Sequence, residues 1–133
     1  MDKSFLLGFL AYLLPTFPLG YFWHLKTFAA RYEALQMYRD QVIIPFGLAS
    51  MVVQGALFSW AYPHLFNTAG EQWVSSALAC ALAYGVLSWS FTTLPVAAKF
   101  RMTSVRGFMA LESAFTALQF IIVAPLMALA YRG

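Results

Sequence analysis

The sequence predicts an all-α fold: a four-helix transmembrane bundle with an amphipathic interfacial segment between the first two spans. Two observations predict it. Of the 133 residues, 62% are hydrophobic and 10% are charged, whereas an ordinary soluble domain is about a quarter charged. The apolar residues also fall into four runs, each long enough for a helix to cross a hydrocarbon core of about 30 Å. Residues 1–133 are therefore expected to form one integral membrane domain.

The first span is predicted over residues 5–23. A signal peptide is the alternative, because FLLGFLAYLL resembles an h-region, but no small-residue cleavage site follows it. Along this span a row of residues recurs at i+4 and shares one helix face: Gly8, Tyr12, Thr16 and Gly20. We expect that face to pack closely against a neighbouring helix.

Residues 24–41 (HLKTFAARYEALQMYRDQ) interrupt the apolar sequence with charged side chains. A helix here would carry an apolar stripe made of Leu25, Phe28, Tyr32 and Leu35. Tyrosines and cations beside such a stripe suit the level of the lipid head groups. The segment is therefore predicted to lie on the membrane surface.

The second span is predicted over residues 42–62, with Pro45 in its first turn, where proline is tolerated. Its expected polar face consists of Gly47, Ser50 and Gln54. The connector, residues 63–72, contains no Lys or Arg. Within it, Thr68 followed by Glu71 predicts a capping box that starts the third helix.

The third span is predicted over residues 73–95 and contains no charge. Its polar and small residues recur at i+4 in two adjoining rows: Ser76, Cys80, Tyr84, Ser88 and Thr92 in one, and Ala77, Ala81 and Gly85 in the other. Small residues in such rows let helix backbones approach closely in lipid. We therefore expect this helix to lie at the centre of the bundle.

The fourth span, residues 107–131, contains one ionisable side chain, Glu112. Glu112, Thr116 and Gln119 lie at i, i+4 and i+7 and so form one polar stripe. A carboxylate inside a membrane costs a few kcal/mol and is a candidate functional group by default. The structural alternative is that Glu112 snorkels, sits favourably at the positive end of the helix dipole, or pairs with Arg39 or a basic loop residue.

The basic residues predict the orientation in the membrane. Six of them fall in the first and third loops: Lys26, Arg31, Arg39, Lys99, Arg101 and Arg106. By the positive-inside rule, loops 24–41 and 96–106 are expected in the cytoplasm and both termini outside, in the periplasm of a bacterium. Because the basic residues lie between apolar runs and not in one block, lipid head groups are the expected partners, and nucleic acid is not.

Several stretches carry a resemblance. FWHLKTF at the end of the first span, IIPFGLASMVVQGALF, AYGVLSWSFTTLPVAAK and an acid early in the fourth span resemble small four-helix bacterial membrane protein families without an assigned function. Where those families lead us to expect an aspartate, this chain has Glu112. The resemblance implies a protein of the bacterial cytoplasmic membrane and implies no substrate.

The polar stripes make up the candidate ligand-binding or proton-coupling residues: Glu112, Thr116, Gln119, Gln54, Ser50, Tyr84, Ser88, Thr92, Tyr12 and Thr16. Two interpretations stay open for the stripes. They form hydrogen bonds between helices, or they converge on a polar interior that holds a ligand or waters.

Other chemistry is not indicated by the sequence. The single cysteine, Cys80, excludes an intrachain disulfide and a dithiol pair, and it is read as a packing residue. His24 and His64 are expected on opposite sides of the bilayer, so no bis-histidine site is predicted within one chain. No catalytic residue, metal site or cofactor is predicted, because no nucleophile–base pair, phosphate loop or metal-ligand spacing occurs.

Three functions remain. The first is a small membrane protein that binds or translocates a small amphipathic or cationic molecule, or a proton, through a polar interior near Glu112. The second is a non-catalytic accessory or scaffold subunit of a larger membrane complex. The third, which has least support, is a lipid-modifying enzyme with Glu112 as general base. The first two predict a homo-oligomer or a subunit of a membrane complex.

Overall fold

The computed structural model describes residues 3–39 and 41–132, which are helical apart from short connections and contain no strand. The elements run in the order α1 (Lys3–Phe22), η1 (Trp23–Thr27), α2 (Ala29–Leu35), α3 (Ile44–Leu65), η2 (Gly70–Gln72), α4 (Trp73–Thr92), α5 (Leu94–Lys99) and α6 (Val105–Ala130). Four helical stretches are long and apolar enough to cross a membrane: Lys3–Thr27, Ile44–Leu65, Gly70–Lys99 and Val105–Ala130. The all-α four-helix bundle is confirmed, with the length and composition of a multi-pass membrane protein.

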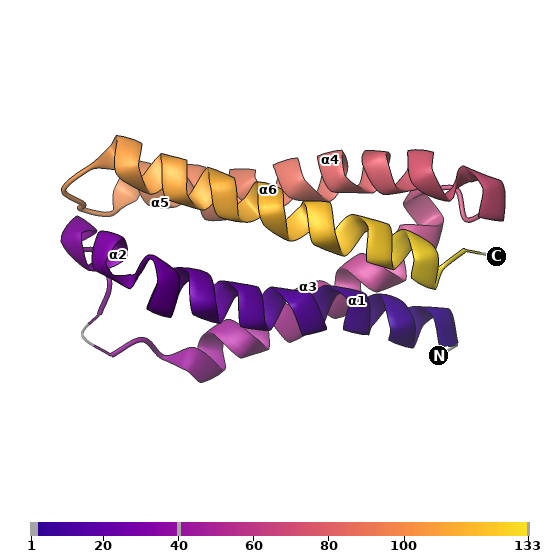
Figure 1. Ribbon diagram of the computed structural model, residues 1–133, viewed down its shortest axis with the longest axis horizontal. Coiled ribbons are helices and arrows are strands. Elements are labelled where there is room, and N and C mark those ends of the chain that lie inside the picture. The colour runs from indigo at the N-terminus through magenta and orange to yellow at the C-terminus, as the bar shows by residue number, and fades with distance from the viewer. Residues whose placement is uncertain (1–2, 40, 133) are drawn as a thin grey trace.

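The long helices lie side by side, and α1 begins at the same end of the bundle at which α6 ends (Figure 1). Helix α6 packs against both α1 and α4, and α1 also packs against α3. The prediction that the third span is central was therefore wrong, because α6 and α1 each pack against two long helices, whereas α4 packs mainly against α6. The large apolar patch that α6 buries, which includes Phe120, Val123 and Met127, explains why.

The outside of the bundle is apolar, and its inside combines small, polar and aromatic residues with apolar ones such as Val123 and Met127. The four buried residues of α1 are Gly8, Tyr12, Thr16 and Gly20, which is the predicted row. By contrast, large apolar side chains on the outer faces are more than 60% exposed, among them Leu14, Phe46, Leu78, Leu82 and Phe91. Such an arrangement suits lipid as the surrounding solvent, because apolar side chains gain nothing there by turning inward.

Helix α3 joins the bundle only through its second half. Residues 41–50 are all exposed, and the start of α3 lies apart from the other helices in Figure 1. Its buried residues are Gly55, Ser59 and Tyr62. The small residues that permit close packing, Gly55 and Ser59, therefore lie later in α3 than the start of the expected polar face at Gly47.

The end of the bundle opposite the termini is covered by η1 and α2. Tyr32 and Leu35 of α2 are buried against Phe108 of α6, and Thr103 donates its backbone N–H to the Leu35 carbonyl. The predicted stripe thus turns inward to α6. At the other end of the bundle, α4 begins at Trp73, and its N-cap residue Gln72 makes no side-chain cap hydrogen bond, so the predicted capping box is wrong. A turn of η2 separates Thr68 from the start of α4.

Candidate functional site

The fourth-span carboxylate is paired with a histidine from the first span. Oε1 of Glu112 lies 2.8 Å from Nε2 of His24, and the two side chains are 13% and 19% exposed. In the described part of the chain this is the only ion pair. The sequence analysis offered Arg39 or a loop cation as the partner, and the structure shows His24 instead.

The helical turn that contains His24 is wider than an α-helix. In η1 the Phe28 N–H donates to the carbonyl of Trp23, five residues earlier. Nδ1 of His24 lies 2.9 Å from the carbonyl oxygen of Gly20, which fixes the ring and aims Nε2 at α6. Single π-type turns of this kind are frequent at functional sites.

A second group approaches the same carboxylate oxygen from α2. The Tyr32 hydroxyl donates to Oε1 of Glu112 over 2.8 Å, and the indole N–H of Trp23 donates to the Tyr32 hydroxyl over 3.1 Å. Burial raises the pKa of Tyr32 far above its ordinary value, and the nearby charge of Glu112 and the hydrogen bond to it raise the pKa further. Tyr32 therefore stays a hydrogen-bond donor at every physiological pH.

The hydrogen bonds restrict where protons lie in the pair. A carbonyl oxygen only accepts, so Nδ1 of His24 must carry a proton for Gly20. The contact between Nε2 and Oε1 then holds one more proton, either on the imidazole in a charged pair or on the carboxyl in a neutral pair. Both forms have zero net charge. The second carboxylate oxygen, Oε2, has no hydrogen-bond partner among the described residues.

Polar residues from all four long helices line one small pocket of about 160 Å³, although two of its lining residues, Ser50 and Thr92, are exposed. Nine of the ten candidate residues are among them: Tyr12, Thr16, Ser50, Gln54, Ser88, Thr92, Glu112, Thr116 and Gln119. Two apolar side chains, Met51 and Phe115, complete the wall. The structure thus brings together the polar stripes of the four spans, with Glu112 as the only carboxylate in the lining.

Some of these residues also join helices to one another. The side-chain amide of Gln119 donates to the hydroxyls of Tyr12 and Thr16, each over 3.3 Å. The Tyr12 hydroxyl in turn donates to the side-chain oxygen of Gln54 on α3. The stripes therefore contain hydrogen bonds between helices, as the first interpretation expects, and the bonded residues also line a cavity, as the second expects.

Other members bond within their own helix or lie elsewhere. Ser50 donates to the Gly47 carbonyl and Thr92 to the Ser88 carbonyl. Tyr84 is the candidate that does not line the cavity. Its hydroxyl donates to the Phe58 carbonyl over 2.7 Å, and its ring stacks on that of Phe58 with centroids 4.1 Å apart, so it packs α4 against α3.

Sequence reasoning missed His24 and Tyr32 as parts of the site. A signal for His24 was present, because it continues the i+4 row of Gly8, Tyr12, Thr16 and Gly20 by one step. No comparable signal marks Tyr32, which depends on how α2 folds back over α6. His64 lies in the last turn of α3, where it contacts the Trp60 ring. It is far from His24, which lies at the opposite end of the bundle (Figure 1).

Comparisons with known proteins add nothing to this geometry: no family model, no curated protein and no solved structure matches the chain. The resemblance to small four-helix bacterial membrane families therefore stays an expectation.

Proposed function

We propose that this chain binds a small amphipathic or cationic molecule, or a proton, in the polar interior of its four-helix bundle, with Glu112 as the binding group. One observation carries the proposal: residues from all four long helices line a single polar cavity that contains one carboxylate. An acid placed inside an apolar bundle is costly and is retained where it serves a function.

The pairing of Glu112 leaves one of its carboxylate oxygens available for a ligand. Oε1 is occupied by His24 and Tyr32, whereas Oε2 is free to contact a group in the cavity. A cation bound at Oε2 is stabilised by the carboxylate charge.

The orientation and assembly belong to the same proposal. The loops that contain residues 24–41 and 96–106 face the cytoplasm, and both termini face the periplasm of a bacterial inner membrane. The pair His24–Glu112 then lies near the cytoplasmic end. A cavity of about 160 Å³ is smaller than usual ligand pockets, so translocation across the membrane requires a homo-oligomer or a membrane complex to complete the path.

The test is native mass spectrometry of the protein gently extracted from its own membrane. The wild type is compared with Glu112→Gln and with the control Glu33→Gln, which makes the same chemical change at an exposed position of α2. A retained small-molecule adduct that is lost only in Glu112→Gln supports the proposal. An adduct that survives in Glu112→Gln, or a wild type that retains no adduct, refutes the binding of a small molecule at Glu112.

A second candidate is the accessory or scaffold subunit, which one observation favours. Ala81 and Gly85 of α4 and Ala117 of α6 line a surface groove of about 430 Å³, where a helix of a larger complex would fit closely. Ala81→Trp would block that groove, and the same extraction would show loss of co-released subunits. Ala77 is not suited to this test, because it lies in the buried core. Release of the chain alone would eliminate this candidate.

A further inference from the structure

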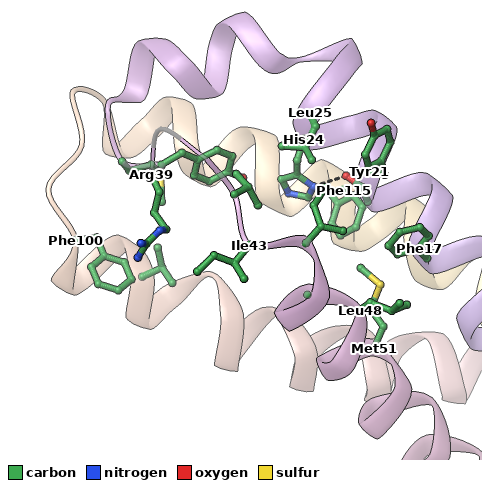
Figure 2. Close-up of a pocket in the computed structure, with 17 residues that line it drawn as sticks. Phe17, Tyr21, His24, Leu25, Arg39, Ile43, Leu48, Met51, Phe100 and Phe115 are labelled. Atoms are coloured by element: carbon green, nitrogen blue, oxygen red, sulfur yellow. Dashed lines mark hydrogen bonds between the residues drawn. The ribbon is translucent and has the colours of Figure 1, made fainter.

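A larger pocket lies outside the polar cavity, at the end of the bundle that carries α2. It has a volume of about 490 Å³ and is bounded by the end of α1, by η1, by the segment before α3 and by the first turns of α3. Figure 2 shows the side chains that line it. Most are apolar or aromatic, among them Phe17, Ile43, Leu48, Met51, Phe100 and Phe115. The volume falls in the range of about 300–1,000 Å³ that is usual for ligand pockets.

The divergence of α3 creates this pocket. Because residues 41–50 do not pack against the bundle, the space between the start of α3 and the end of α1 is left to a ligand or to lipid. Gly47 marks the open side, since a Cβ atom added there would meet no atom within 4 Å. A hydrocarbon chain from the surrounding lipid could enter between α1 and α3 without moving a helix.

One cation, that of the exposed residue Arg39, is among the groups that line this apolar pocket. Figure 2 shows the guanidinium group of Arg39 reaching into the pocket toward Phe100. No carboxylate of the described residues lies within ion-pair distance of it, since the ion pair of His24 and Glu112 is the one that those residues form. A guanidinium beside apolar walls favours a partner that brings an anionic group, which it binds through two parallel hydrogen bonds.

We infer that this pocket binds an amphipathic anion with a single hydrocarbon chain. The chain lies between α1 and α3 against Phe17, Leu48 and Met51, and the carboxylate or phosphate head group lies at Arg39. The site goes beyond the function proposed for the polar cavity, since it uses a different charged residue and an opposite charge of ligand. Met51 and Phe115 line both spaces, so an occupant of the pocket touches the wall of the polar cavity.

The probe is dodecanoate, added to the full chain in a non-ionic detergent, and binding is followed by native mass spectrometry. Arg39→Gln removes the charge and is expected to weaken binding by about tenfold or more, as loss of a charge-assisted hydrogen bond does. Gly47→Leu fills the pocket from its open side and is expected to abolish binding. The matched control is Arg106→Gln, which removes an exposed arginine that does not line the pocket.

Dodecyltrimethylammonium and dodecanol carry the same hydrocarbon chain as dodecanoate, but the head group of the first is positively charged and that of the second is uncharged. Both compounds are expected to bind at least tenfold more weakly than dodecanoate. Equal binding of the three compounds, or equal binding by wild type and Arg39→Gln, overturns the inference. If an anionic phospholipid with two chains binds and dodecanoate does not, the inference that the ligand has a single hydrocarbon chain is overturned. The variants' thermal unfolding midpoints show that they fold. Because Glu112→Gln leaves Arg39 in place, failure of the polar-cavity proposal and failure of this inference are distinguishable.

Discussion

Nε2 of His24 lies 2.8 Å from Oε1 of Glu112, although the two residues are 88 positions apart in the chain. The pair joins the last turn of the first span to the second turn of the fourth, because α1 and α6 run antiparallel (Figure 1). It gives a hydrogen-bond partner to an acid in an apolar bundle, and it leaves the second carboxylate oxygen without a partner among the described residues.

The pair is expected to stabilise the fold measurably. In a double-mutant cycle, His24→Ala and Glu112→Gln should show a coupling of about 1–3 kcal/mol, because each single change removes the partner of a largely buried polar group. Reversible unfolding in detergent, followed by circular dichroism, measures it. The matched cycle uses His64→Ala with Glu112→Gln and should show additivity within about 0.5 kcal/mol. Equal coupling in the two cycles would contradict the pairing.

Tyr32 is expected to make the protein less stable in alkali. Its pKa is raised from the ordinary value of 10.0 by burial first and by Glu112 second. The unfolded chain therefore loses the phenolic proton above about pH 10 while the folded chain keeps it, so the free energy of unfolding falls as the pH rises, by up to about 1.4 kcal/mol per pH unit.

Tyr32→Phe should make that fall shallower when unfolding is measured between about pH 10 and 11.5. Between pH 7 and 9, where neither state loses the proton, the slope of wild type and variant should agree. A slope unchanged by the substitution above pH 10 would show that the raised pKa of Tyr32 does not contribute.

Gln119 is expected to contribute modestly to stability, as helix-joining hydrogen bonds in membranes do. Gln119→Leu removes its donations to Tyr12 and Thr16, and at about 0.6 kcal/mol for each bond the loss should be about 1 kcal/mol. Unfolding by a denaturing detergent measures the difference. Ser50→Ala is the control, because the exposed Ser50 hydroxyl donates only within its own helix. A loss as large for Ser50→Ala as for Gln119→Leu would argue against the network.

Two glycines are expected to respond oppositely to the same substitution. In Gly8→Ala the new methyl group would overlap the Ser59 hydroxyl and lie 2.9 Å from the Tyr131 ring, so the loss of stability should be about 1–3 kcal/mol. Gly47→Ala meets no atom within 4 Å and should stabilise α3 by up to about 1 kcal/mol through helix propensity. Thermal unfolding midpoints of both variants decide this, and a similar shift in both would refute the packing described here.

Much of the cavity lining was predictable from spacing alone. Gly8, Tyr12, Thr16 and Gly20 recur every fourth residue, and a helix surrounded by lipid has reason to turn such small and polar residues inward. The same argument holds for Glu112 and the residues that follow it on α6. When each span turns its polar face inward, those faces meet, and the cavity of about 160 Å³ lies where they do.

The errors have equally physical causes. Periodicity shows which face of a helix is distinctive but not which neighbour it meets, so the third span was expected at the centre, whereas α6 and α1 are the helices that each pack against two long helices. Spacing also does not reveal that α3 diverges over residues 41–50, which exposes Ser50 and opens the pocket at Arg39. Tyr84 follows the polar period of its span, yet it packs against Phe58.

The sequence by itself determined the four spans, the helical class and the faces that turn inward, because these depend on hydropathy and on periods within one helix. Only the tertiary structure decided that Glu112 pairs with His24 and Tyr32. Those contacts depend on the antiparallel course of α1 and α6, on the wide turn η1 that aims the imidazole, and on α2 folding over the end of the bundle. Such relations between distant segments come from packing, which no local period encodes.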